Sequence, residues 1–214
     1  YLAWHEGLQI PVAVKVISKE NALDDEHFSE RFMREARIAA QLSHSNIVRV
    51  YDCGETDTEY YLVMEYVEGE SCRDKMEQWG AFDWQRGVQI TRQVAEGLRY
   101  ASRKGVIHRD IKPENIMIGT DGDARIADLG LAKQVVTGRG SATADGDVLG
   151  TPYYMSPEQI NSARDVDFRS DIYSLGITLY HLVCGVVPYV GSTFEVMTKH
   201  VREPLPSPKQ HVKD

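Results

Sequence analysis

Cysteine is scarce in this sequence, which has only Cys53, Cys72 and Cys184 in 214 residues. The three are widely spaced, and neither a Cys-x-x-Cys pair nor a cluster of cysteine and histidine occurs. A disulfide scaffold needs a dense, even set of cysteines, and a structural zinc site needs ligands at short fixed spacings. The scarcity argues against both and favours a reducing, cytosolic setting.

Long apolar runs and an excess of basic residues are also absent. No stretch approaches the ~18 apolar residues that span a bilayer, and the first residues show no signal-peptide pattern. The 24 lysines and arginines face 32 aspartates and glutamates, which gives a formal charge of −8. Nucleic-acid-binding surfaces are basic, so a general nucleic-acid partner is not expected. One highly charged ligand in a local basic pocket stays compatible with this balance.

The chain does contain enough apolar material for a core. Hydrophobic residues make up 42% and charged residues 26%, which is typical of a soluble globular protein. The length suits one large domain or two small lobes.

The first part of the chain is typical of strands with one helix. Residues 10–17 alternate and are rich in β-branched side chains, so they predict a strand, with Lys15 in its middle. Residues 24–42 predict a helix, and Glu35 lies within its apolar stripe, where a carboxylate needs a partner. Two further strands are predicted at residues 47–51 and 60–67.

Helices dominate after a change of composition near residues 66–70, which we take as a boundary between lobes. Residues 84–103 predict an amphipathic helix, residues 170–184 a buried helix, and residues 193–201 a short one. Residues 129–158 are rich in Gly, Ser and Thr without periodicity, and long irregular segments in compact domains are usually functional or disordered. The helix over 84–103 is expected to place Val88, Thr91, Ala95, Leu98 and Ser102 near one face.

The stretch VIHRDIKPENIMI, residues 106–118, concentrates polar groups within an apolar frame. Its apolar ends predict a pair of strands. Asp110, Lys112, Glu114 and Asn115 would then lie on the short loop between them.

Four motifs carry a resemblance to a known family: VAVK (12–15), HRDIKPEN (108–115), ADLG (127–130) and GTPYYMSPEQ (150–159). VAVK alone is common, whereas HRDIKPEN is highly specific. In this order, over essentially the whole chain, they resemble the protein kinase superfamily, and especially the bacterial serine/threonine kinases of the eukaryotic type. The resemblance implies transfer of the ATP γ-phosphate to Ser or Thr hydroxyls of protein substrates.

The resemblance also implies an α+β, two-lobed protein kinase fold. A small β-rich N-lobe with one main helix would cover residues 1–66, and a larger, mostly helical C-lobe would cover residues 67–214. The family's Gly-rich loop precedes a pair like Tyr1-Leu2, and further helices follow the one near 193–201. We therefore expect a kinase domain truncated at both ends. The kinase domain would be cytoplasmic, and relatives often carry a membrane segment beyond it.

Roles in phosphate transfer follow from the same resemblance. Lys15 would contact the α- and β-phosphates and pair with Glu35, which would otherwise be a rim carboxylate reaching solvent. Asp110 would accept the proton of the substrate hydroxyl, and its alternative is an aspartate that caps a turn. Lys112 would contact the γ-phosphate.

The remaining ATP-binding residues are placed likewise. Asn115 and Asp128 would hold Mg²⁺, or Mn²⁺ in its place, because magnesium prefers hard oxygen donors. The adenine would lie against a pocket in which plain core packing is the alternative for the apolar members. That pocket comprises Ala13, the gatekeeper Met64, the hinge from Glu65 to Val67, and Met117.

Residues 129–158 would form the activation segment. Thr143 is the first candidate for phosphorylation, followed by Ser141 and Thr137, and a phosphate there could pair with Arg109. A surface ion pair is the alternative for Arg109. Thr151 would bond the catalytic loop and shape the substrate site.

Two buried supports of the loop are also implied. Asp171 would hold the catalytic-loop backbone from below, with a helix N-cap as its alternative role. His108 would pack and hydrogen-bond at the base of the loop.

Two other functions compete with the protein kinase. A non-catalytic pseudokinase or scaffold that binds nucleotide or a partner is kept open by the Gly-rich loop, which does not precede Tyr1. A small-molecule phosphotransferase of the antibiotic-kinase type fits less well, because GTPYYMSPEQ and the long activation segment favour a protein substrate.

Overall fold

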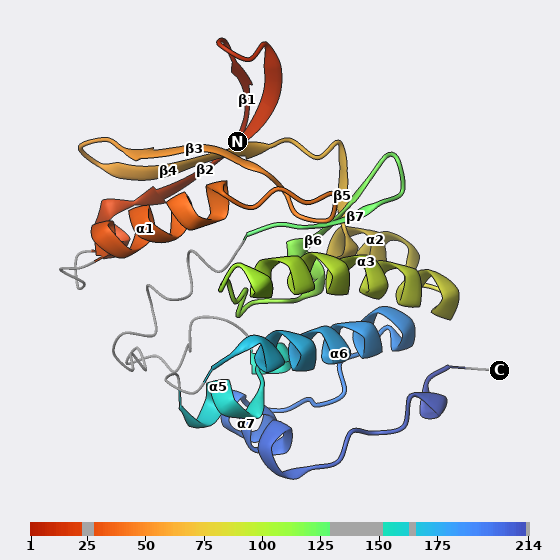
Figure 1. The fold of residues 1–214 in the computed structure, drawn as a ribbon. Helices are drawn as coiled ribbons and strands as arrows, with labels where there is room; N and C mark the ends of the chain where they lie inside the picture. The colour runs from red at the N-terminus through yellow and green to blue at the C-terminus, as the bar shows by residue number, and fades with distance from the viewer. Residues whose placement is uncertain (23–27, 129–151, 163–165, 213–214) are drawn as a thin grey trace.

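A four-stranded antiparallel sheet and one helix form the N-lobe of the computed structural model, which describes residues 1–22, 28–128, 152–162 and 166–212. The strands are β1 (Leu2–His5), β2 (Ile10–Ser18), β3 (Val50–Glu55) and β4 (Glu59–Glu65), in the order β1-β2-β4-β3. Helix α1 (Phe28–Ala40) lies along this sheet (Figure 1). Lys15 therefore sits on a central strand, paired with Leu62 of β4.

Aromatic packing joins α1 to the sheet. The rings of Phe28 and Phe32 have centroids 4.8 and 5.3 Å from that of Tyr60, and all three side chains are buried. Aromatic pairs at this separation stabilise a fold beyond the effect of the apolar area that they bury. The next buried position of the helix is Ala36, which leaves Glu35 half-buried beside the stripe.

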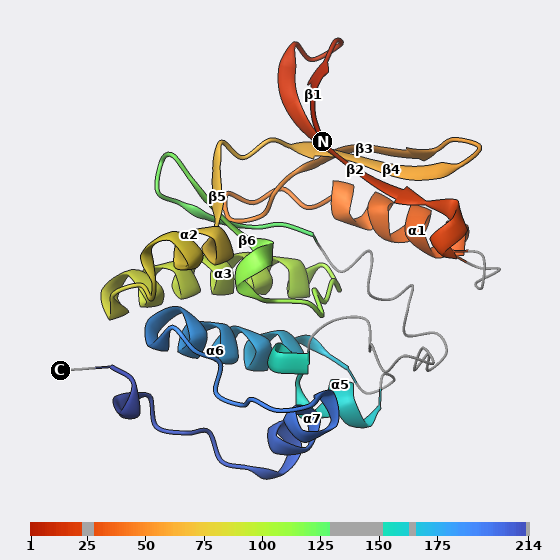
Figure 2. The ribbon, with the colours of Figure 1, turned by 180° about the vertical axis from the view of Figure 1, so that it is seen from behind.

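A second, three-stranded antiparallel sheet lies between the N-lobe sheet and the long helices (Figure 2). Its strands are β5 (Gly69–Ser71), β6 (Ile116–Gly119) and β7 (Ala124–Ile126). Helix α2 (Cys72–Trp79) follows β5 directly, because Ser71 and Asp74 form a capping box that satisfies its first backbone donors. The HRDIKPEN segment leads directly into β6, which pairs with β7.

Two long helices make up the centre of the C-lobe. Helix α3 (Trp84–Arg103) packs along α6 (Phe168–Cys184), as Figures 1 and 2 both show. Helix α6 begins at the N-cap Asp167 and ends at Gly185, whose φ of 72° is left-handed and therefore suits glycine. The smaller helices are α5 (Pro157–Asn161), α7 (Thr193–Arg202), and the 3₁₀ turns η1 (Lys19–Ala22), η2 (Pro113–Asn115), η3 (Pro152–Tyr154) and η5 (Pro208–Gln210).

The α+β, two-lobed fold is as predicted, but several details differ. The helix over 84–103 has the expected bounds, but of the residues expected near one face only Leu98 is buried: Val88 is 48% exposed and Ala95 is exposed. The strand expected at 47–51 begins at Val50, and only the second apolar end of VIHRDIKPENIMI is a strand, β6. The side chains of α3 that are buried are Gly87, Ile90, Val94, Gly97, Leu98 and Ala101.

Among the helices in the described part of the chain, none combines the length and the apolar character required to cross a bilayer.

Candidate active site

The backbone of the catalytic loop is fixed from α6. Asp171 is 4% exposed, and its two carboxylate oxygens accept hydrogen bonds from the N–H groups of His108 (2.8 Å) and Arg109 (2.7 Å). Burial raises the pKa of Asp171, whereas the electrostatic interaction with His108 and these two N–H donors oppose the rise. The N-cap of α6 is Asp167 and not Asp171, so the alternative role considered for Asp171 is wrong.

His108 is fully buried and links the loop to the segment that precedes Asp128. Its Nδ1 accepts the N–H of Asp110 at 3.2 Å, and its Nε2 lies 3.0 Å from the carbonyl oxygen of Ala127. Because Nδ1 acts as an acceptor, the ring proton of the neutral form belongs on Nε2, which donates to Ala127. His108 is therefore a structural link at the loop base, as expected.

The carboxylate of Asp110 is surrounded by the polar groups of its own motif. Asn115 Nδ2 donates to the carbonyl oxygen of Asp110 at 2.8 Å and to its Oδ2 at 3.0 Å. Lys112 Nζ lies 3.2 Å from the same Oδ2. The structure thus brings together the predicted base, the predicted γ-phosphate contact and one predicted metal ligand.

The loop and the segment of the predicted metal ligand Asp128 both contain a left-handed backbone conformation. The φ angles are 66° at Arg109 and 55° at Asp128. Non-glycine residues in this region cost roughly 1–3 kcal/mol each and persist where their surroundings hold them, often at active sites. The contacts of Asp171 with the loop are one such restraint.

The partner of Lys15 differs from the predicted one. Lys15 Nζ lies 2.8 Å from Asp128 Oδ1, and both side chains are 36% exposed. Glu35 Oε1 is instead buried and makes no hydrogen bond within the described residues. Burial raises the pKa of Glu35, while Arg34, Arg109 and Arg31 hold it down in part. Lys15 is thus paired with the carboxylate of Asp128, and Glu35 lies near several arginines.

The residues predicted for the adenine pocket come from two sheets and the link between them. Ala13 pairs with Met64 across β2 and β4, and both are half-buried. Met117 lies on β6, and Val67 is buried just after β4. Within the hinge, the N–H of Glu65 donates to the Arg49 carbonyl at 2.8 Å.

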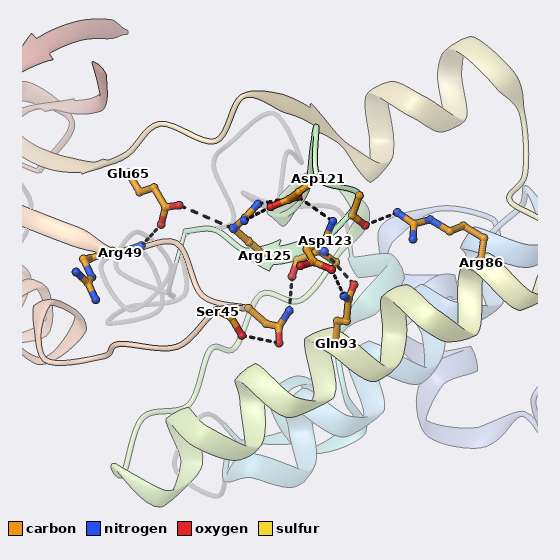
Figure 3. Close-up of polar contacts among 11 residues, drawn as sticks. Ser45, Arg49, Glu65, Arg86, Gln93, Asp121, Asp123 and Arg125 are labelled. Atoms are coloured by element: carbon orange, nitrogen blue, oxygen red, sulfur yellow. Dashed lines mark hydrogen bonds and ion pairs between the residues drawn. The ribbon is translucent and has the colours of Figure 1, made fainter. Parts of the chain in front are cut away.

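Figure 3 shows a polar network behind this hinge that sequence reasoning missed. The carboxylate of Glu65 accepts the N–H of Arg49 at 3.2 Å, and its Oε1 lies 3.8 Å from Nε of Arg125 on β7. Arg125 in turn pairs with Asp121 of the β6–β7 turn. This network joins the hinge to the second sheet, and a sequence pattern cannot reveal it because its members are distant along the chain.

The predicted regulatory residues are described only in part. Thr137, Ser141, Thr143 and Thr151 lie outside the described residues. Arg109 is described, and its Nε is buried without a hydrogen-bond partner there.

Comparison with known proteins agrees with this geometry. The protein kinase domain family matches residues 1–211. The chain is 41% identical to the serine/threonine-protein kinase PknB of Mycobacterium leprae over 217 residues, which cover 99% of this chain and 34% of that protein. It is 40% identical to a probable serine/threonine-protein kinase of Clostridium perfringens over 199 residues, 92% of this chain and 28% of that protein.

This chain belongs to the protein kinase domain family. Its relatives are named as bacterial serine/threonine-protein kinases, and the chain spans about a third of their length.

Proposed function

We propose that this chain transfers the γ-phosphate of ATP to serine or threonine hydroxyls of protein substrates. The observation that carries the proposal is the loop around Asp110, where the amide nitrogen of Asn115 and the ammonium of Lys112 lie 3.0 and 3.2 Å from the same carboxylate oxygen. Kinases do little covalent chemistry themselves, and position and neutralise the reacting groups. A loop restrained at Asp110, His108 and Arg109 serves that purpose.

In the proposed reaction, Asp110 takes the proton of the substrate hydroxyl. The oxygen then forms a bond to the γ-phosphorus as the bond to the β-phosphate oxygen breaks, which releases ADP. Lys112 lies beside Asp110 Oδ2 and is placed to contact the transferred phosphoryl group. Lys15 binds the α- and β-phosphates, which compete with Asp128 for its ammonium.

Asn115 and Asp128 fit the role of magnesium ligands. Asn115 uses Nδ2 for both hydrogen bonds to Asp110, which leaves its amide oxygen as the donor for a cation. Asp128 adds a carboxylate, and magnesium takes such oxygens together with phosphate oxygens. The ion, when bound, neutralises charge on the phosphates.

The adenine is proposed to lie against Ala13, Met64, Met117 and the hinge from Glu65 to Val67. Glu35 is proposed to pair with Lys15 when ATP is bound. Arg109 is proposed to receive a phosphate on the activation segment, Thr143 first and then Ser141 or Thr137, and its unpartnered buried Nε supports an anionic partner. Thr151 is proposed to bond the catalytic loop. The lobe boundary is proposed at residues 66–67.

The test is transfer of labelled γ-phosphate from ATP, with Mg²⁺ or Mn²⁺, to the chain and to a generic basic protein. The variants are Asp110→Asn and, as a matched control, Asp57→Asn in the exposed β3–β4 turn. We expect label on Ser or Thr for the wild type and Asp57→Asn, and none for Asp110→Asn. A folded wild type that binds ATP but transfers no label would support the alternative, a pseudokinase.

A further inference from the structure

Helix α5 carries a side chain that contacts the loop of Asp110 from outside the loop's own motif. Gln159 Nε2 donates to the carbonyl oxygen of Arg109 at 2.9 Å. We propose that Gln159 is a positioning residue, which fixes the peptide joining Arg109 to Asp110 and thereby aims the Asp110 carboxylate. This inference rests on the proposed function, because Asp110 is the base in that reaction.

The peptide between Arg109 and Asp110 needs such a restraint. Arg109 has a φ of 66°, so its backbone is held in a region that non-glycine residues rarely adopt. The N–H of this peptide, on Asp110, donates to His108 Nδ1 at 3.2 Å, and its carbonyl accepts from Gln159. Each polar end of the peptide therefore has a side-chain partner, and Gln159 is the partner on the carbonyl side.

Gln159 performs a second task at the same time. It is the third residue of α5, and its Oε1 accepts the N–H of the N-cap Ser156 at 3.0 Å, while Ser156 Oγ accepts the N–H of Gln159. This is a capping box, in which the third residue reaches back to the cap. The oxygen of the Gln159 amide thus closes the helix end, and its nitrogen is free to donate to Arg109.

The other capping boxes of the described helices show why an amide matters here. Helices α2 and α7 use the carboxylates of Asp74 and Glu195 at the same position. A carboxylate is the better choice for a cap alone, because the N-terminal end of a helix attracts negative charge. An ionised carboxylate cannot donate a hydrogen bond, however, so it could not hold the Arg109 carbonyl.

A small hollow lies beside this contact. Gln159 lines one small hollow together with Asp110, Tyr154 and Met155. The motif GTPYYMSPEQ ends at Gln159 and supplies three of these four residues. Its last residue therefore links α5 to the peptide that precedes the proposed base.

The discriminating substitution is Gln159→Glu, which keeps the acceptor of the cap, removes the donor to Arg109 and adds a negative charge. The matched control is Glu195→Gln, the reverse exchange in the capping box of α7. For Gln159→Glu we expect kcat to fall about 10-fold, with the KM for ATP within about 2-fold and the thermal midpoint unchanged. The loss should shrink as pH is lowered, because a protonated carboxyl can donate again. Glu195→Gln should leave kcat and its pH profile unchanged.

A second measurement tests the restraint without any turnover. Hydrogen exchange of the Asp110 N–H should be about 10-fold faster in Gln159→Glu than in the wild type and unchanged in Glu195→Gln. A wild type that transfers no phosphate would overturn the proposed function, while faster exchange would still support the restraint. Gln159→Glu with wild-type kcat, pH profile and Asp110 exchange would overturn this inference alone.

Discussion

Replacing Asp171 by asparagine tests how far the catalytic loop depends on α6. Each carboxylate oxygen of Asp171 accepts one backbone N–H of the loop, from His108 and from Arg109. Asparagine keeps one acceptor and places an NH₂ donor where the second acceptor was. One loop N–H would then face another donor in a site where Asp171 is only 4% exposed.

The magnitude follows from the lost contact. A buried donor left without a partner costs about 1–3 kcal/mol, and hydrogen bonds to charged groups are at the upper end. Part of this loss of stability is offset, because burial destabilises the ionised form of Asp171, as its raised pKa indicates, and the neutral asparagine avoids that cost. We expect the free energy of unfolding to fall by about 1–3 kcal/mol. Release of the left-handed Arg109 should also displace Asp110 and reduce kcat.

Urea unfolding at pH 7 gives the stability change as a shift of the midpoint at constant slope. Asp167→Asn is the matched control, because it makes the same change at the partly exposed N-cap of α6, where asparagine caps about as well as aspartate and only a surface ion pair with Arg169 is lost. Phosphate transfer would be measured on both. If Asp171→Asn were as stable and as active as Asp167→Asn, the carboxylate would not be supporting the loop.

Two further predictions concern the C-lobe. Burial lowers the pKa of His181 to about 4, so the unfolded chain, with an ordinary value near 6.5, binds a proton that the folded chain does not. The free energy of unfolding should therefore fall by up to about 3 kcal/mol as pH drops from 6.5 to 4. In His181→Gln, the urea midpoint should depend less on pH over this range. A Cβ on Gly97 of α3 would come within 2.9 Å of the Asn46 carbonyl, so Gly97→Ala should lower stability by about 1–3 kcal/mol in the same assay. Gly176→Ala in α6, where a Cβ meets nothing within 4 Å, should change stability little or raise it by up to about 1 kcal/mol.

Long elements were predictable from sequence because their periodicity extends over several turns. The helix predicted over 84–103 has the bounds of α3, yet its buried side was misplaced, since the true contact includes Gly87 and Gly97. Hydrophobicity gives a glycine no weight in a stripe, although its lack of a side chain allows another element to approach closely. At Gly97 the close neighbour is the Asn46 carbonyl.

Short elements were missed for a different reason. Strands β1 and β5 have four and three residues, too few for an alternation of apolar and polar side chains to be recognised. Whether such short segments form strands depends on the strands with which they pair. Helix α2 had a usable signal in the Ser71–Asp74 capping box. Helix α5 begins at the equivalent box of Ser156 and Gln159.

At the site, the motif residues were predictable and their partners were not. Asp110, Lys112 and Asn115 lie within one octapeptide, so local geometry alone brings them together. The pairing of Lys15 with Asp128 instead depends on the left-handed φ of Asp128 and on where two sheets meet. A pattern of residue types predicts neither the backbone angle of Asp128 nor the relative position of the two sheets.

Asp128 and Glu35 are alternative partners for the ammonium of Lys15, and the energetics of Glu35 favour one of the two arrangements. The two carboxylates with predicted roles beside Lys15 are those of Asp128 and Glu35. Asp128 pairs with the Lys15 ammonium, whereas Glu35 is partly buried near several arginines. Burial raises the pKa of Glu35, so its ionised form is destabilised where it lies, and an opposite charge at close range would relieve that cost. Phosphates that draw Lys15 from Asp128 would also release that carboxylate for a cation. The cost of leaving Glu35 Oε1 buried without a hydrogen bond in the described part of the chain would therefore favour the proposed pairing of Glu35 with Lys15 once phosphates are bound.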